Sequence, residues 1–116
     1  MRTILRRWAF TLAVLVTLSA PGFAQTFPSK PVRLVNPFDA GGVVDAVGRT
    51  LAQKLSERWG QPVITENHPG GGTVIAAGLV AKSPPDGYTL LIAAADTLVI
   101  NPSLMPKISY SPTRDF

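Results

Sequence analysis

Two glycine-rich turns are the segments of this sequence best suited to chemistry, because each leads from an expected strand straight into an expected helix. The first turn ends in Gly41-Gly42, and the second contains Gly70-Gly71-Gly72. Glycine lets the backbone approach a bound molecule closely, and the first turn of a helix offers unpaired N–H groups with a partial positive charge. The turns therefore predict a site for a carboxylate or a phosphate. The simpler alternative is that the glycines only satisfy the geometry of tight turns.

Signatures of nucleotide binding and of nucleophilic catalysis are missing from the sequence. The triple glycine is not a dinucleotide fingerprint, because Ile75 stands where the third glycine should be, and neither GxxxxGK[ST] nor GxSxG occurs. His68 is the single histidine and has no partner at metal-ligand spacing, so a solvated loop histidine is favoured over a catalytic one. We expect no catalytic residue, no metal and no cofactor, and hence not an enzyme.

Asp45 is the acidic residue closest to the first glycine turn, and it falls in the first turn of the helix expected to follow. The simpler interpretation is an acid favoured there by the helix dipole. The alternative is that its carboxylate orders the preceding loop, or a water within it, around a ligand.

The elements that must position these turns follow the order β-α-β-α-β. Residues 31–36, 61–67 and 88–93 are expected strands, residues 43–59 and 73–82 are expected helices, and a short helix is expected to begin over residues 97–100. Gly60 is expected to end the first helix, and the residues predicted to form that helix's buried face are Val44, Val47, Leu51, Leu55 and Trp59. The connections are long enough for parallel strands, so the fold class is α/β, a parallel sheet with covering helices.

The turns that follow the three strands share one edge of such a sheet. They cover residues 38–42, 68–72 and 94–96. Ligands of open α/β sheets bind outside the carboxyl ends of the strands, so this edge is the expected binding site.

The first 24 residues have the pattern of a secretory signal peptide. Arg2, Arg6 and Arg7 precede an apolar run, and the segment ends in Gly22-Phe23-Ala24, with small residues where a signal peptidase cuts. The apolar run is shorter than the roughly 20 residues that span a bilayer, so a signal is favoured over a membrane anchor. We expect cleavage after Ala24.

Most of the net positive charge of the chain lies in that segment. The whole chain has 11 basic and 7 acidic residues, whereas residues 25–116 have 8 basic against 7 acidic residues, a net charge of +1. We therefore expect no nucleic-acid or membrane-surface partner. The sequence has no cysteine, which excludes structural disulfides and a lipidated anchor, so a soluble periplasmic protein is expected.

Motifs spread over residues 27–116 resemble the tripartite tricarboxylate transporter substrate-binding proteins, also called Bug receptors. They comprise residues 28–35, Gly41-Gly42 with Asp45, and residues 51–56, 60–63, 66–70, 85–91, 101–104 and 115–116. The resemblance implies a lobe like those of type II periplasmic binding proteins, in a receptor whose two lobes close on a small organic acid or amino-acid-like ligand. It also implies membrane transporter subunits as partners.

Carried over to this sequence, the resemblance implies ligand-binding positions in all three turns. They are Phe38, Asp39, Ala40, Gly41, Gly42 and Asp45, then Gly70, Gly71, Gly72 and Thr73, then Ala95, Asp96 and Thr97. Family members are longer and have two lobes, so residues 25–116 are expected to be the incomplete N-terminal part of the first lobe, with the second lobe absent. A truncated, non-functional remnant is the alternative, and an α/β enzyme is less favoured.

The sequence departs from the family pattern within these turns. Asp39-Ala40 replaces the usual Pro-Pro, Val44 replaces a small hydroxyl residue, Thr73-Val74 replaces Gly-Asn, and Asp96 replaces a small or hydroxyl residue. Carboxylates at 39 and 96 would favour a ligand that carries a donor beside its own carboxylate. The alternative is two local caps, with Asp39 bonding its own turn and Asp96 capping the helix from Thr97.

Overall fold

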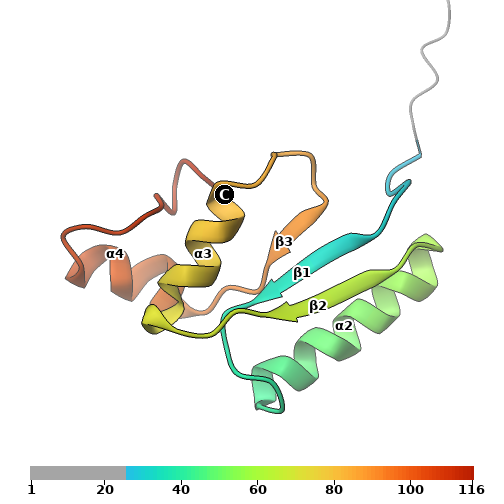
Figure 1. Cartoon of the computed structure of the whole chain (residues 1–116), viewed down its shortest axis with the longest axis horizontal. Helices are drawn as coiled ribbons and strands as arrows, with labels where there is room; N and C mark the ends of the chain where they lie inside the picture. Colours follow the sequence, from blue (N-terminus) through green and yellow to red (C-terminus); the bar gives the residue numbers. More distant parts are fainter. Residues whose placement is uncertain (1–25) are drawn as a thin grey trace, which may run out of the picture.

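A computed structural model describes residues 26–116, and its centre is a parallel sheet of three strands (Figure 1). The strands β1 (Val32–Asn36), β2 (Val63–Asn67) and β3 (Thr89–Leu91) lie in the order β2-β1-β3. Val32 pairs with Val63, and Arg33 pairs with Thr89. The expected parallel sheet is confirmed, although β3 is shorter than predicted. The expected signal peptide lies outside the described residues.

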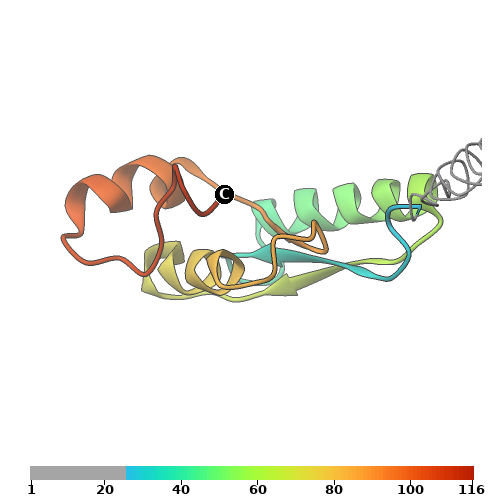
Figure 2. The ribbon, with the colours of Figure 1, turned by 90° about the horizontal axis from the view of Figure 1, so that it is seen from above.

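Two helices cover opposite faces of the sheet. The helix α2 (Val43–Trp59) follows β1, and α3 (Val74–Ala81) follows β2. Because β2 and β3 lie on opposite sides of β1, right-handed crossovers place the two helices on opposite faces. Figure 2 shows α2 and α3 on either side of the strands. After β3 come the π-helix η2 (Asp96–Ile100) and the short α4 (Asn101–Leu104).

The core between α2 and the sheet is formed by Val32, Leu34, Ala52 and Val63, with half-buried apolar side chains around them. The predicted buried face of α2 is wrong in part, since Val47 is 61% exposed and Leu51 47% exposed. The helix instead turns its small residues Gly48 and Ala52 to the sheet. A Cβ on Gly48 would lie 2.6 Å from the Ile92 Cδ1 atom, so a larger residue there would require the Ile92 side chain to shift.

The ends of both helices follow from backbone geometry. Gly60 adopts φ 65° and its N–H donates to the Ser56 carbonyl at 3.0 Å, which confirms the expected end of α2. The second helix starts at Val74 and not at Thr73, because the preceding turn, η1 (Gly71–Thr73), is left-handed. The helix α3 packs through small residues, since it buries Ala76, Ala77 and Gly78.

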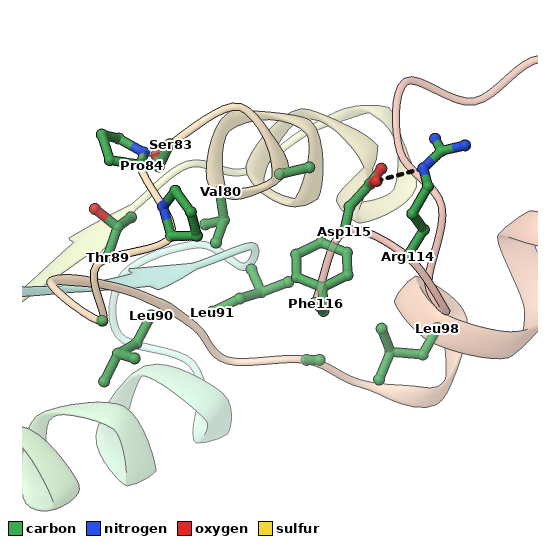
Figure 3. Close-up of a pocket in the computed structure, with 14 residues that line it drawn as sticks. Val80, Ser83, Pro84, Thr89, Leu90, Leu91, Leu98, Arg114, Asp115 and Phe116 are labelled. Atoms are coloured by element: carbon green, nitrogen blue, oxygen red, sulfur yellow. Dashed lines mark hydrogen bonds and ion pairs between the residues drawn. The ribbon is translucent and has the colours of Figure 1, made fainter.

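The outer edge of β3 carries no strand within the described residues. The Tyr88 carbonyl and the Ile92 N–H pair with β1, so the backbone groups of Thr89 and Leu91 point to the free edge. A groove of about 620 Å³ lies beside this edge. Figure 3 shows Phe116 pointing into it between Leu91 and Leu98.

An aromatic cluster ties the start of the described chain to the opposite end of the sheet. The Phe27 ring lies 6.0 Å from Trp59 and 5.0 Å from Tyr88, measured between ring centroids. The Ser29 N–H donates to the Tyr88 hydroxyl at 2.8 Å. No helix within residues 26–116 is long and apolar enough to cross a membrane.

Candidate functional site

The strand-following turns meet at one edge of the sheet, and Asn67 joins the first turn to the end of β2. The Asn67 Nδ2 atom donates to the Phe38 carbonyl at 3.0 Å and to Asp45 Oδ1 at 2.9 Å. Phe38 is half-buried, whereas Asp39, Ala40, Gly41 and Gly42 are exposed. The turn is thus anchored at both ends and presents its middle to solvent.

Asp45 is the buried charge of this site, with 3% of its surface exposed. Its Oδ2 atom accepts from the Gly41 N–H and from Arg49 Nε, both at 2.9 Å. The hydrogen bond from Arg49, with those from Gly41 and Asn67, holds the pKa of the Asp45 carboxyl well below its ordinary value of 3.8. The interpretation that Asp45 orders the preceding loop is therefore confirmed, while its role toward a ligand stays a prediction.

The second turn has a run of left-handed backbone. Gly70, Gly71 and Gly72 have φ values of 115°, 57° and 58°, and Thr73 follows at 76°. Glycine adopts this region freely, but a residue with a Cβ pays roughly 1–2 kcal/mol. These glycines therefore do serve the geometry of the turn, and a role in ligand binding stays a prediction. Thr73 is the one non-glycine residue of residues 26–116 with a positive φ, so something must hold it there.

Buried polar side chains connect the second turn to the third. The Thr97 hydroxyl donates to the Thr73 hydroxyl at 3.0 Å, and Asn101 Nδ2 donates to the same oxygen at 3.2 Å and to the Gly72 carbonyl. The Tyr110 hydroxyl donates to the Thr97 carbonyl. Thr73, Thr97 and Asn101 are all buried. The fold thus brings the second and third turns into direct contact.

The expectation that Asp96 caps the helix from Thr97 is wrong, because the helix begins at Asp96 itself, with Ala95 as its N-cap residue and no side-chain capping bond. The Asp96 Oδ1 atom accepts from the Thr97 N–H at 2.8 Å, a contact between adjacent residues. The neighbouring Ala95 is exposed. The Asp39 carboxylate accepts no hydrogen bond from residues 26–116, so the expectation that it bonds its own turn is not confirmed either.

Asn36 and Asn101 are polar residues of this edge that sequence reasoning did not single out. Asn36 is fully buried at the end of β1, where its Oδ1 atom accepts from the Phe38 N–H at 3.1 Å. Its Nδ2 atom has no partner among the described residues, and a buried donor without a partner is costly. An asparagine within an otherwise apolar strand was the available signal. Asn101 entered the sequence analysis only within the motif of residues 101–104, with no role assigned to it.

Two observations limit what this edge can do chemically. No group of three or more His, Cys, Asp or Glu side chains that could hold a metal ion exists within residues 26–116. None of the predicted binding residues lines the groove beside β3. The edge offers backbone N–H groups, hydroxyls, amides and the carboxylates of Asp39 and Asp96, which are groups that recognise an anion or a polar molecule.

A protein-family comparison agrees with this geometry. Residues 47–116 match the family described as tripartite tricarboxylate transporter family receptor. BugT of Bordetella pertussis is 41% identical over 99 residues, which cover 84% of this chain and 30% of BugT. The chain spans about a third of the length of the curated relatives it matches.

Solved structures of similar sequence share the fold. Periplasmic binding protein BugD is 39% identical with a TM-score of 0.73, over 78% of this chain and 30% of BugD. MatC from Rhodopseudomonas palustris, solved with bound malate, is also 39% identical with a TM-score of 0.73, over 78% of this chain and 31% of MatC. An R. palustris protein solved with adipate is 38% identical with a TM-score of 0.71, over 75% of this chain and 29% of that one. The expected α/β fold of periplasmic-binding-protein type is confirmed.

Proposed function

Because the chain belongs to the tripartite tricarboxylate transporter receptor family, we propose that it is part of a periplasmic receptor whose strand-following turns bind a small carboxylate. Members of this family are solute-binding receptors and not enzymes, in agreement with the sequence expectation. The binding positions proposed are those of residues 38–42 with Asp45, residues 70–73 and residues 95–97.

The observation that carries the proposal is the open start of α2 beside an ordered glycine turn. Gly42 is the N-cap residue and supplies no side chain, so the amides of the first helical turn have no side-chain partner. The first intrahelical bond runs from the Ala46 N–H to the Gly42 carbonyl at 3.0 Å. The Asp45 carboxylate accepts a hydrogen bond from the Gly41 N–H and so fixes the turn. The other N–H groups at the start of α2 are then available to bind an anion.

The ligand class is supported by the relatives. MatC was solved with malate and another R. palustris protein with adipate, and both molecules are dicarboxylates. A carboxylate matches the positive end of a helix and the backbone N–H groups and hydroxyls of the second turn. The proposal therefore names a carboxylate-bearing ligand in preference to a phosphate.

Location and partners follow the same proposal. Residues 1–24 would direct export and be removed, and the receptor would deliver its ligand to membrane subunits of a tripartite transporter. BugD is named a periplasmic binding protein, which supports this assignment. Edman sequencing of periplasmic material should begin at Gln25, and a sequence beginning at Met1 would count against it.

Calorimetric titration of the receptor with malate, adipate, citrate, glutamate and inorganic phosphate tests the function. We expect saturable binding of at least one carboxylate and none of phosphate. Asp45→Asn should weaken that binding about tenfold, because a single amide oxygen cannot accept both from the Gly41 N–H and from Asn67 Nδ2, as the two carboxylate oxygens do. Asp86→Asn is the matched control, since Asp86 also accepts from a backbone N–H, that of Tyr88, but precedes β3. Absence of carboxylate binding, or equal effects of both variants, would contradict the proposal.

A further inference from the structure

The second binding turn holds a conformation that its own sequence does not favour. Thr73 adopts φ 76° directly after three glycines with positive φ. Its N–H donates to the Gly70 carbonyl at 3.2 Å, which closes the turn locally. This single bond does not remove the steric conflict of a β-branched residue in left-handed backbone, so the conformation must be held from outside the turn.

Asn101 makes the contacts that hold it. The Asn101 Nδ2 atom donates both to the Gly72 carbonyl and to the Thr73 hydroxyl, so one amide group fixes two successive residues. Thr97 adds a second donor to the Thr73 hydroxyl at 3.0 Å. Asn101 is 6% exposed and Thr73 3% exposed, so water does not compete well for these bonds.

The segment that carries Asn101 turns its polar side chains, not its apolar ones, to the second turn. Thr97 and Asn101 are buried, whereas Leu98, Val99 and Ile100 between them are 39%, 63% and 47% exposed. This is the reverse of the usual pattern for a helix on a core. The π-turn contributes, because the Asn101 N–H bonds to the Asp96 carbonyl five residues earlier, and such turns are frequent at functional sites.

We infer that Asn101 is a positioning residue for ligand binding: its amide holds the left-handed turn of residues 70–73 in the geometry that presents the turn to the ligand. This inference rests on the proposed function, since it names a residue that supports one of the proposed binding turns. The Asn101 Nδ2 atom is committed to Gly72 and Thr73, so it acts on the ligand through the turn.

The test compares Asn101→Asp with Ser56→Ala in the receptor. Asp has the shape of Asn but no Nδ2 donor, so the contacts with the turn are lost. Ser56→Ala removes the hydrogen bonds of the Ser56 hydroxyl with the Ala52 carbonyl and the Val63 N–H, at the end of α2 far from the turns, so it controls for general destabilisation. Amide hydrogen exchange at Gly72 and Thr73 in the unliganded receptor should accelerate about tenfold in Asn101→Asp and stay unchanged in Ser56→Ala. The dissociation constant for malate or adipate, measured well below the unfolding temperature, should rise about tenfold in the first variant only.

A double-mutant cycle with Thr73→Gly separates positioning from stability. Glycine relieves the left-handed strain, so Asn101→Asp should cost less affinity in the Thr73→Gly background than in the wild type. Equal exchange rates in Asn101→Asp and wild type, or equal effects of the two single variants, would overturn the inference. If wild-type receptor binds neither malate nor adipate, those probes give no support to the proposed function, and the exchange comparison alone decides the role of Asn101.

Discussion

The Asp45 carboxylate accepts a hydrogen bond from the Gly41 amide at 2.9 Å, so a residue inside α2 fixes the turn that precedes the helix. The same carboxylate accepts from Asn67 at the end of β2, also at 2.9 Å. One buried charge therefore couples the first turn, the first helix and the second strand.

Replacing Asp45 with alanine should destabilise the fold as well as the site. Three hydrogen bonds end on this carboxylate, and the Gly41 amide and Asn67 amide would lose their acceptor. For a domain of this size we expect the melting temperature to fall by roughly 5–15 °C. Circular dichroism on heating measures it. Asp86→Ala, which removes an exposed acid, should change the melting temperature far less, and similar losses in both variants would argue against the coupling.

Glu66 should contribute a pH-dependent part of the stability. Arg33 donates to Glu66 through Nε at 2.8 Å and Nη2 at 2.7 Å, and His68 Nε2 lies 3.3 Å from Oε2. The hydrogen bonds from Arg33, with a smaller one from His68, lower the pKa of Glu66 from 4.5 to about 2. Because the folded-state pKa is depressed, this contribution is complete above pH 4.5 and is lost as the pH falls toward 2.

The acid limb of the unfolding free energy, measured by urea titration between neutral pH and pH 2.5, checks this expectation. Glu66→Gln should be less stable than the wild type near pH 7, and the difference should shrink as the pH falls. Because both side chains are partly exposed, the difference should be modest, about 1 kcal/mol or less. A difference that grows on acidification would contradict the assignment.

The sequence predicted those features of the fold that depend on local patterns of residues. The order of strands and helices along the chain and the end of α2 at Gly60 were predictable, because apolar runs and turn glycines act locally. The side of α2 that faces the sheet was not predictable. Gly48 and Ala52 determine it by allowing the helix to approach the sheet closely, and a search for a periodicity of large apolar residues overlooks such small residues. The contact of Asn101 with Gly72 joins positions 29 residues apart and leaves no local pattern.

Asp96 offers a test of ligand class. One oxygen of its carboxylate accepts from the Thr97 N–H, and the other accepts no hydrogen bond within residues 26–116. If that oxygen reaches a ligand, the receptor should bind an amino acid or a pyridine carboxamide more tightly than citrate. Asp96→Ser should then reduce the preference about tenfold, as loss of a charge-assisted hydrogen bond does. Competition calorimetry measures this. Citrate binding more tightly than every amino-bearing ligand, with Asp96→Ser leaving the ranking unchanged, would end the idea.

The free edge of β3 should make the chain of residues 25–116 marginal and prone to self-association when it is studied alone. Unpaired backbone groups of Thr89 and Leu91 border an apolar groove there. Size-exclusion chromatography should show oligomers that Thr89→Lys reduces, because a lysine at a strand edge disfavours edge-to-edge pairing. Thr50→Lys, on the exposed side of α2, is the control and should leave the oligomers in place. A monomer with a cooperative thermal transition and strong carboxylate binding would contradict this expectation.

A crystal structure of the receptor bound to the tightest carboxylate of the calorimetric panel tests the central claim most directly. The account predicts one ligand carboxylate within hydrogen-bond distance of backbone N–H groups from both residues 38–42 and residues 70–73, with Asp45 still bonded to the Gly41 amide. A carboxylate held away from both turns, for example in the groove beside β3, would contradict it.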